Sequence, residues 1–234
     1  MSETLFDSPQ RRTITPAVQW LLAANIGVYF LQLTLFGSDQ VYNALGLSFG
    51  DLSSGWWTPF TYMFVHAGLW HLAFNMLALW MFGCDLERRW GSSFFLRYYF
   101  ITVIGGGILN TLFVPNQMGP SIGASAGVYG ILLAYGLIYP NRIVYFYFLF
   151  PIKMKHYVWI IGAIALYSSI TAGQSGIAHL AHLGGMVFGY LYLRGGNPFD
   201  RVKDYLDRRR LARLKRRFQV YPGRKDDDSG PTFH

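Results

Sequence analysis

The chain has 234 residues, of which 52% are hydrophobic, 18% are aromatic and only 14% are charged. This composition excludes an ordinary water-soluble domain, because so few charges cannot cover the surface of a protein of this size. The net charge is +8, but the basic residues flank apolar runs and are not interleaved with a stacking surface. We therefore expect a membrane protein with no nucleic-acid partner.

Six apolar runs follow one another along the chain. At about 1.5 Å of helical rise per residue, they suit a hydrocarbon core about 30 Å thick, with the shorter runs extended by aromatic or polar flanks. Arg97 is the one charged residue within them. The sequence therefore predicts an all-α polytopic membrane protein with six transmembrane helices. The runs are Ala17–Leu35, Leu69–Cys84, Phe94–Val114, Ile122–Tyr139, Tyr157–Ile170 and Ile177–Leu193.

Basic residues are confined to one side of the predicted membrane. All 20 Lys and Arg residues precede the first run, lie in or beside alternate connections, or follow the last run. By the positive-inside rule, both termini should be cytoplasmic, and we expect a bacterial inner membrane. The predicted organisation is a cytoplasmic segment 1–16, a membrane domain 17–194 and a basic cytoplasmic tail 195–234. In that tail, Asn197–Phe218 resembles a helix that contacts anionic lipid or stays solvated.

Three of the runs carry polar groups that lipid would penalise. His71 and Asn75 lie in the second run, Ser125 in the fourth, and His179 and His182 in the sixth. Counted from the outer ends of the runs, these groups fall within about two helical turns of the outer surface, with Ser125 about 7 Å deep. The i, i+4 spacing of His71 and Asn75 puts both on one helix face. We therefore expect one shallow polar layer.

This layer contains the groups that serine hydrolysis needs. The hydroxyl of Ser125 becomes a nucleophile when an imidazole accepts its proton, and either His182 or His179 can be that base. The side chains of His71 and Asn75, with the backbone N–H of Ser125, can donate to the oxyanion of a tetrahedral intermediate. The residues alone favour a hydrolase with its site inside the membrane, and they leave the choice of histidine open.

The same residues also fit less reactive roles. A Gly-x-Ser-x-Gly pattern in a glycine-rich membrane helix is ordinarily a close-packing surface, and here it lacks the strand-to-helix turn of soluble hydrolases. His179, His182 and His71 have donor atoms for a metal, but the layer lacks a carboxylate, because Asp51 and Glu87 fall outside it. We therefore expect neither a metal nor another cofactor. A transporter would need internal repeats and a midplane site, and the sequence has neither.

Three motifs, in the same order on three helices, resemble those of the rhomboid family of intramembrane serine proteases. The likeness extends from about Thr15 to Arg194 and implies the six-helix rhomboid bundle. Its specificity comes from the combination, since each motif alone is short. The motifs are HLAFN (His71–Asn75), GASAGVY (Gly123–Tyr129) and AHLGGMVFG (Ala181–Gly189).

The resemblance implies a serine endopeptidase that cleaves transmembrane segments of other membrane proteins. Ser125 would be the nucleophile and His182 the general base, in a dyad without an acidic third member. His71 and Asn75 would supply oxyanion donors. The supporting residues would be Tyr129, whose ring stacks on His182, and Gly123, which lies beside the serine. Gly185 and Gly189 would allow close approach of the sixth helix to the fourth.

Two positions depart from the family pattern. Ala126 follows the nucleophile where glycine is common, and Thr58 follows Trp57 where the family often has arginine. The resemblance also leaves an alternative, a non-catalytic rhomboid-like protein that binds and escorts membrane clients. Such relatives lose the serine or the histidine, whereas this sequence keeps both. In either case the expected partners are transmembrane proteins and membrane lipids.

Overall fold

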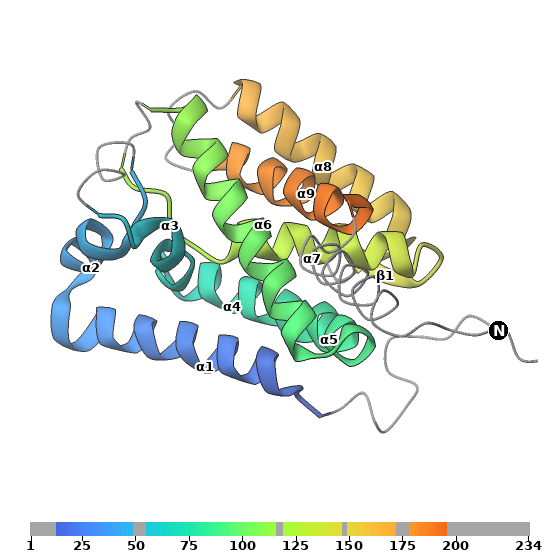
Figure 1. Cartoon of the computed structure of the whole chain (residues 1–234), viewed down its shortest axis with the longest axis horizontal. Helices are drawn as coiled ribbons and strands as arrows, with labels where there is room; N and C mark the ends of the chain where they lie inside the picture. The colour runs from blue at the N-terminus through green and yellow to red at the C-terminus, as the bar shows by residue number, and fades with distance from the viewer. Residues whose placement is uncertain (1–12, 49–54, 116–118, 147–148, 172–177, 196–234) are drawn as a thin grey trace, which may run out of the picture. The chain divides into compact units, whose positions relative to one another are not determined.

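A computed structural model of the chain describes residues 13–48, 55–115, 119–146, 149–171 and 178–195 (Figure 1). The described residues up to Arg194 form one compact, mostly helical unit. The predicted helix at Asn197–Phe218 lies outside the described residues. The prediction of a helical membrane protein is confirmed, and its separation into three segments stays a prediction.

Helices correspond to all six apolar runs. Those that span residues 16–36, 69–90 and 92–113 are long and apolar enough to cross a membrane. The prediction of six spans is consistent with the remaining helices and stays a prediction for them. The helices are α1 (Pro16–Leu31) with its π-helical continuation η2 (Gln32–Phe36), α4 (Leu69–Ala78) continued by η5 (Leu79–Gly83) and α5 (Cys84–Trp90), α6 (Ser92–Phe113), α7 (Ser125–Ile138), α8 (Met154–Thr171) and α9 (His179–Gly195).

The connections contain structure that the apolar pattern did not predict. Between η2 and α4 lie α2 (Ser38–Leu45), α3 (Thr58–Thr61) and a 3₁₀ turn, η4 (Tyr62–Phe64). Between α7 and α8, strands β1 (Ile143–Phe146) and β2 (Phe150–Lys153) form an antiparallel hairpin. The fold is therefore helical with one small hairpin.

Glu87 joins three helices at one end of the bundle. Its carboxylate accepts hydrogen bonds from the backbone N–H of Ala17 at 2.8 Å and of Val18 at 2.9 Å, both in the first turn of α1. It also accepts from the hydroxyl of Thr15 and, at 2.6 Å, from that of Ser92 at the start of α6. The first N–H groups of a helix have no partner within it, so this carboxylate of α5 caps α1 from outside.

A second charged cluster at this end connects α5, α7 and the hairpin. Asp85 accepts from the guanidinium of Arg142 at 2.8 Å and from the hydroxyl of Tyr135 at 3.0 Å. Arg88 pairs with the other oxygen of Asp85 at 3.2 Å. The Arg142 guanidinium also lies over the ring of Tyr139, 4.5 Å from its centroid. The two clusters thus give the carboxylates of Asp85 and Glu87 partners from neighbouring segments.

The core between α6 and α7 is built around buried tyrosines whose hydroxyls reach backbone carbonyls. Tyr98 in α6 donates to the carbonyl of Gly130 in α7 at 2.6 Å. Tyr62 in η4 donates to the carbonyl of Val103 in α6 at 2.7 Å. Both rings are fully buried. Each hydroxyl finds a partner in an apolar interior, as burial of a polar group requires, and the bonds fix α6 against its neighbours.

Candidate active site

The site lies where α4, α7 and α9 begin. Ser125 is the first residue of α7, and its Oγ lies 2.7 Å from Nε2 of His182, a residue 57 positions away in the first turn of α9. The depth of about 7 Å expected for Ser125 assumed a helix that begins near Pro120, whereas α7 begins at Ser125 itself. Gly123 has a φ of 107°, a backbone conformation that residues other than glycine rarely adopt. The helix therefore starts only after it.

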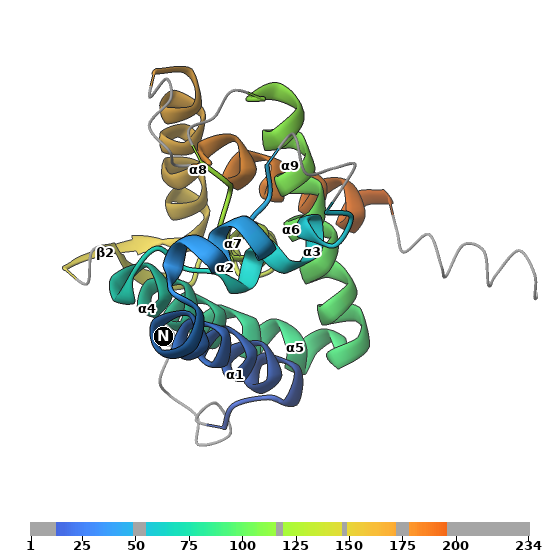
Figure 2. The same cartoon turned by 90° about the vertical axis from the view of Figure 1, so that its left-hand side faces the viewer.

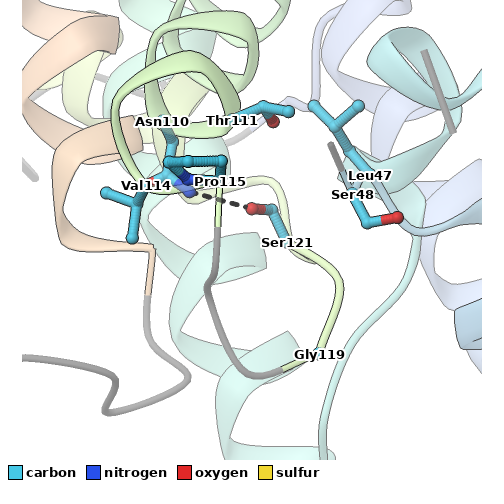
Figure 3. Close-up of a pocket in the computed structure, with 8 residues that line it drawn as sticks. All are labelled: Leu47, Ser48, Asn110, Thr111, Val114, Pro115, Gly119 and Ser121. Atoms are coloured by element: carbon cyan, nitrogen blue, oxygen red, sulfur yellow. Dashed lines mark hydrogen bonds between the residues drawn. The ribbon is translucent and has the colours of Figure 1, made fainter. Parts of the chain in front are cut away.

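Hydrogen bonds from distant segments hold the loop before Ser125. Ser121 pairs with Leu47 by two backbone bonds of 2.7 and 3.0 Å, and the N–H of Gly123 donates to the carbonyl of Tyr62 at 2.9 Å. The side-chain amide of Asn110 in α6 donates to Ser121 Oγ at 3.1 Å (Figure 3). No local sequence pattern indicates these residues, because the bonds join segments that are far apart in the chain. Together they fix the position from which α7 presents Ser125.

The imidazole of His182 is oriented by stacking. The ring of Tyr129, one turn after Ser125 in α7, lies parallel to it, with centroids 4.4 Å apart and 7° between the planes. His179 lies at the start of α9 with its ring edge-on to His182, and the centroids are 6.1 Å apart. The structure thus brings His182, of the two candidate histidines, within hydrogen-bonding distance of Ser125.

His71, in the first turn of α4, presents one ring nitrogen to the loop before Ser125. Its Nδ1 accepts a hydrogen bond from the backbone N–H of Ala67 at 3.3 Å, so a neutral ring carries its proton on Nε2. A Cβ placed on Gly123 would lie 2.8 Å from that Nε2 and 2.7 Å from Cε1. Glycine at position 123 therefore allows both the turn and the close approach of a ring N–H donor.

Asn75 lies one turn below His71 on the same helix and is buried. Its side-chain Nδ2 donates to the carbonyl of His71 at 2.8 Å. An amide nitrogen has two hydrogens, so this bond leaves a second N–H for another acceptor. His71 and Asn75, at the predicted i, i+4 spacing, are therefore joined by a hydrogen bond that orients the Asn75 amide.

Gly185 and Gly189 of α9, both expected to allow close helix approach, face different neighbours. A Cβ on Gly185 would lie 2.0 Å from the carbonyl oxygen of Ala126 in α7, so only glycine allows α9 to approach the first turn of α7 this closely. A Cβ on Gly189 would instead meet the hydroxyl of Tyr98 in α6 at 2.4 Å. Gly185 thus serves the expected contact with α7, whereas Gly189 packs against α6.

His66, three residues before α4, is a polar neighbour of His71. The side chain is fully buried, its ring is edge-on to His71 with centroids 5.0 Å apart, and its Nε2 has no hydrogen-bond partner within the described part of the chain. Burial, together with the nearby His71, lowers the pKa of His66 to about 4. The imidazole is therefore neutral at ordinary pH and leaves an acceptor nitrogen beside the site.

The residues that the structure describes hold no group of three His, Cys, Asp or Glu side chains arranged to bind a metal. Asp85 and Glu87 lie near the opposite end of the helix that carries His71. The arrangement at the site instead combines a hydroxyl with an acceptor imidazole and nearby N–H donors. Those are the groups needed for nucleophilic attack and stabilisation of an oxyanion.

Comparison with known proteins gives consistent matches. A family model described as the Rhomboid domain matches residues 53–196. The chain is 34% identical over 135 residues to Rhomboid protein 1, mitochondrial, of Saccharomyces cerevisiae, which covers 55% of this chain and 38% of that protein. It is 37% identical over 138 residues to Rhomboid protease GluP of Bacillus subtilis, covering 58% and 25%.

A longer match is to Rhomboid protease AarA of Providencia stuartii, with 27% identity over 194 residues, 73% of this chain and 69% of that protein. Coverage of the yeast and Arabidopsis relatives is lower. The chain spans 38% of the yeast protein and 54% of RHOMBOID-like protein 12, mitochondrial, of Arabidopsis thaliana. It therefore corresponds to about half of these relatives or less.

Proposed function

The chain belongs to the rhomboid family, and we propose that it is an intramembrane serine endopeptidase with Ser125 as nucleophile and His182 as general base. The observation that carries this proposal is the 2.7 Å contact between Ser125 Oγ and His182 Nε2, with the imidazole stacked on Tyr129. Two of the matched relatives are named rhomboid proteases, which supports the same activity.

The proposed reaction proceeds through an acyl-enzyme. Ser125 Oγ attacks the carbonyl carbon of the scissile peptide while its proton passes to Nε2 of His182. His182 then gives this proton to the leaving amine as the C–N bond breaks. The acyl part of the substrate is left as an ester of Ser125. Water attacks the ester, His182 takes the proton of that water and returns it to Ser125 Oγ, and the acid product leaves.

The oxyanion of both tetrahedral intermediates would lie among donors from two helices. The backbone N–H of Ser125 is free of intrahelical bonding because it opens α7. His71 contributes Nε2–H, and Asn75 contributes the second hydrogen of Nδ2. The positive ends of the α4, α7 and α9 dipoles face the same region, which favours negative charge there. Donors fixed before the reaction need little rearrangement when that charge develops.

The proposed substrates are transmembrane segments of other membrane proteins, and no cofactor is required. A helical segment has its carbonyls engaged within the helix, so a segment weakened by glycine or proline is easier to unfold at the nucleophile. The neutral His66 offers polar lining for the water that hydrolysis needs. The distribution of basic residues supports a cytoplasmic segment 1–16 and tail 195–234 around the membrane domain 17–194. Location in a bacterial inner membrane stays a prediction.

The test compares wild type and Ser125→Ala in proteoliposomes. We expect the variant to lose labelling by a serine-reactive fluorophosphonate and to cleave a model transmembrane substrate at least about 10⁴-fold more slowly. Removal of a hydroxyl leaves the fold unchanged, so the thermal unfolding midpoint should match that of wild type.

Retained cleavage by a folded Ser125→Ala preparation would contradict the assignment of the nucleophile. A wild-type protein that binds a membrane protein but neither cleaves it nor reacts with the probe would favour the escort alternative. EDTA should leave cleavage unchanged, and a loss restored by zinc would favour a metal site instead.

A further inference from the structure

The hairpin between α7 and α8 has one face turned toward the protein and one turned away from it. In the register of the two strands, Val144 lies opposite Ile152 on the inner face, and Val144 is buried in the core. On the opposite face, Tyr145 pairs with Pro151 and Ile143 with Lys153. Directly opposite residues of antiparallel strands share a face, so these four form the outward face of the hairpin.

This outward face combines an aromatic ring with positive charge. Tyr145 is 56% exposed, and Pro151 and Lys153 are also exposed. Lys155, in the first turn of α8, is exposed just beyond the strand. The sequence from Pro140 to Tyr157 contains no Asp or Glu. Aromatic residues and cations without anions are the composition of membrane–water interfaces, where aromatic rings lie at headgroup level and cations meet phosphate.

The depth of the hairpin follows from its backbone. The described residues form only a two-stranded sheet here, so one edge of each strand lacks a strand partner. Unpaired backbone N–H and C=O groups are costly in hydrocarbon and readily solvated among headgroups and water. The charged pair of Arg142 and Asp85, next to the start of β1, also indicates a position at the membrane–water interface. The hairpin therefore belongs in the interface and not in the hydrocarbon core.

The hairpin is also placed to reach lipid. Figure 2 shows β2 projecting sideways from the helices, beyond the base of α8. Arg142 lies on the same segment, but its guanidinium is engaged by Asp85 and Tyr139. Lys153 and Lys155 are the exposed cations of this connection. Their charge is complementary to the phosphate of an anionic lipid, which is the feature that selects lipid over a neutral partner.

We propose that the outward face of the hairpin, with Lys153 and Lys155, binds the headgroups of anionic phospholipids and anchors the base of α8 in that leaflet. Lys153 is followed directly by Met154, where α8 begins. A lipid bound by these lysines would therefore hold the first turn of that helix in place. The inference rests on the hairpin alone and does not depend on protease activity.

The first experiment measures lipid retention. Wild type and the double variant Lys153→Gln/Lys155→Gln are purified from nanodiscs of phosphatidylcholine with phosphatidylglycerol, and bound lipid is identified by native mass spectrometry. The variant should bind phosphatidylglycerol up to about 30-fold more weakly, or about 2 kcal/mol, while phosphatidylcholine retention is unchanged.

The control Arg89→Gln/Arg194→Gln removes the same charge at the same end of the bundle, because α5 and α9 both end there. It should retain phosphatidylglycerol as wild type does. Equal loss in both double variants would show a response to net charge only and would overturn the proposal. Unchanged retention in the lysine variant would overturn it as well.

A second measurement locates the face directly and does not need the lysine variants. In a Cys84→Ala background, Tyr145→Cys is labelled with an environment-sensitive fluorophore and reconstituted in vesicles of the same lipids. The label should be quenched by headgroup-labelled lipid and protected from aqueous iodide. Strong iodide quenching would overturn the proposal. Protection that rises with protein density would assign the face to a second copy of the chain and would overturn it too.

Discussion

Where α4, α7 and α9 begin, the site residues are uncharged and make few hydrogen bonds, whereas the carboxylates of Asp85 and Glu87 near the opposite ends each accept several. Ser125 and His182 share one hydrogen bond, and Asn75 has a donor to spare. Glu87, by contrast, accepts from four donors on two other segments. A reactive side chain must be able to exchange its hydrogen-bond partners, whereas a side chain that stabilises the fold must keep them. The bundle separates these demands by placing Asp85 and Glu87 on α5, at the other end from Ser125.

The largest effect is expected from a substitution at the end of the bundle that holds Ser125 and His182. His182→Ala should lower kcat/KM at least about 10⁴-fold, because the dyad loses its base. His179→Ala is the matched control one turn away, and it should lose less than about tenfold, short of the 10²–10⁴ contribution of a general base. Cleavage of a fluorogenic transmembrane substrate in proteoliposomes measures both. The opposite ranking would transfer the role of base to His179.

Asn75→Ala tests whether the spare donor acts in the transition state. We expect kcat to fall about 10²–10³-fold, or about 2.7–4 kcal/mol, with KM nearly unchanged. Asn25→Ala is a close control, because Asn25 is buried in α1 and bonds the carbonyl of Leu21 at 2.7 Å just as Asn75 bonds that of His71. It should leave kcat unchanged. A rise in KM at constant kcat for Asn75→Ala would place Asn75 in substrate binding.

Glu87→Ala addresses the stable end. Loss of the carboxylate leaves several buried donors without an acceptor, so we expect the free energy of unfolding to fall by about 2–3 kcal/mol. Equilibrium unfolding in mixed detergent micelles measures it. Asp39→Ala removes a carboxylate from an exposed position and should cost less than about 1 kcal/mol. Turnover per folded molecule should stay at the wild-type value in both variants, and a selective loss for Glu87→Ala would couple the two ends.

Much of the helical framework could be predicted, because long apolar runs have few alternatives in a membrane. The error at the start of α7 has a local physical cause. Ile122 continues the apolar run, but Ser121 is paired with Leu47 and Gly123 has a positive φ, so the chain bends at Gly123 and becomes helical only from Ser125. Hydrophobicity locates a membrane segment and does not distinguish its helical part from an extended entry.

The hairpin was missed because its residues form a nearly continuous run of aromatic and apolar side chains, without the alternation that marks a half-buried strand. The external cap on α1 was also missed. Thr15 and Pro16 indicate a helix start, but nothing local points to a carboxylate about 70 residues away, as the bond from Ala17 to Glu87 shows. The motifs named the site residues, whereas the 2.7 Å contact between Ser125 and His182 needed the fold.

The placement of Ser125 on α7 and His182 on α9 has a consequence for biosynthesis. As the chain emerges from the ribosome, the proposed nucleophile enters the bilayer two helices before the proposed base. Until α9 inserts and Gly185 comes against Ala126, the chain holds a serine without an acceptor for its proton. In the proposed protease, the site would stay inert until α9 arrives, so the nascent chain could not attack the machinery that inserts it. A chain that stops at Thr171 should therefore reach the membrane and remain unlabelled by the fluorophosphonate.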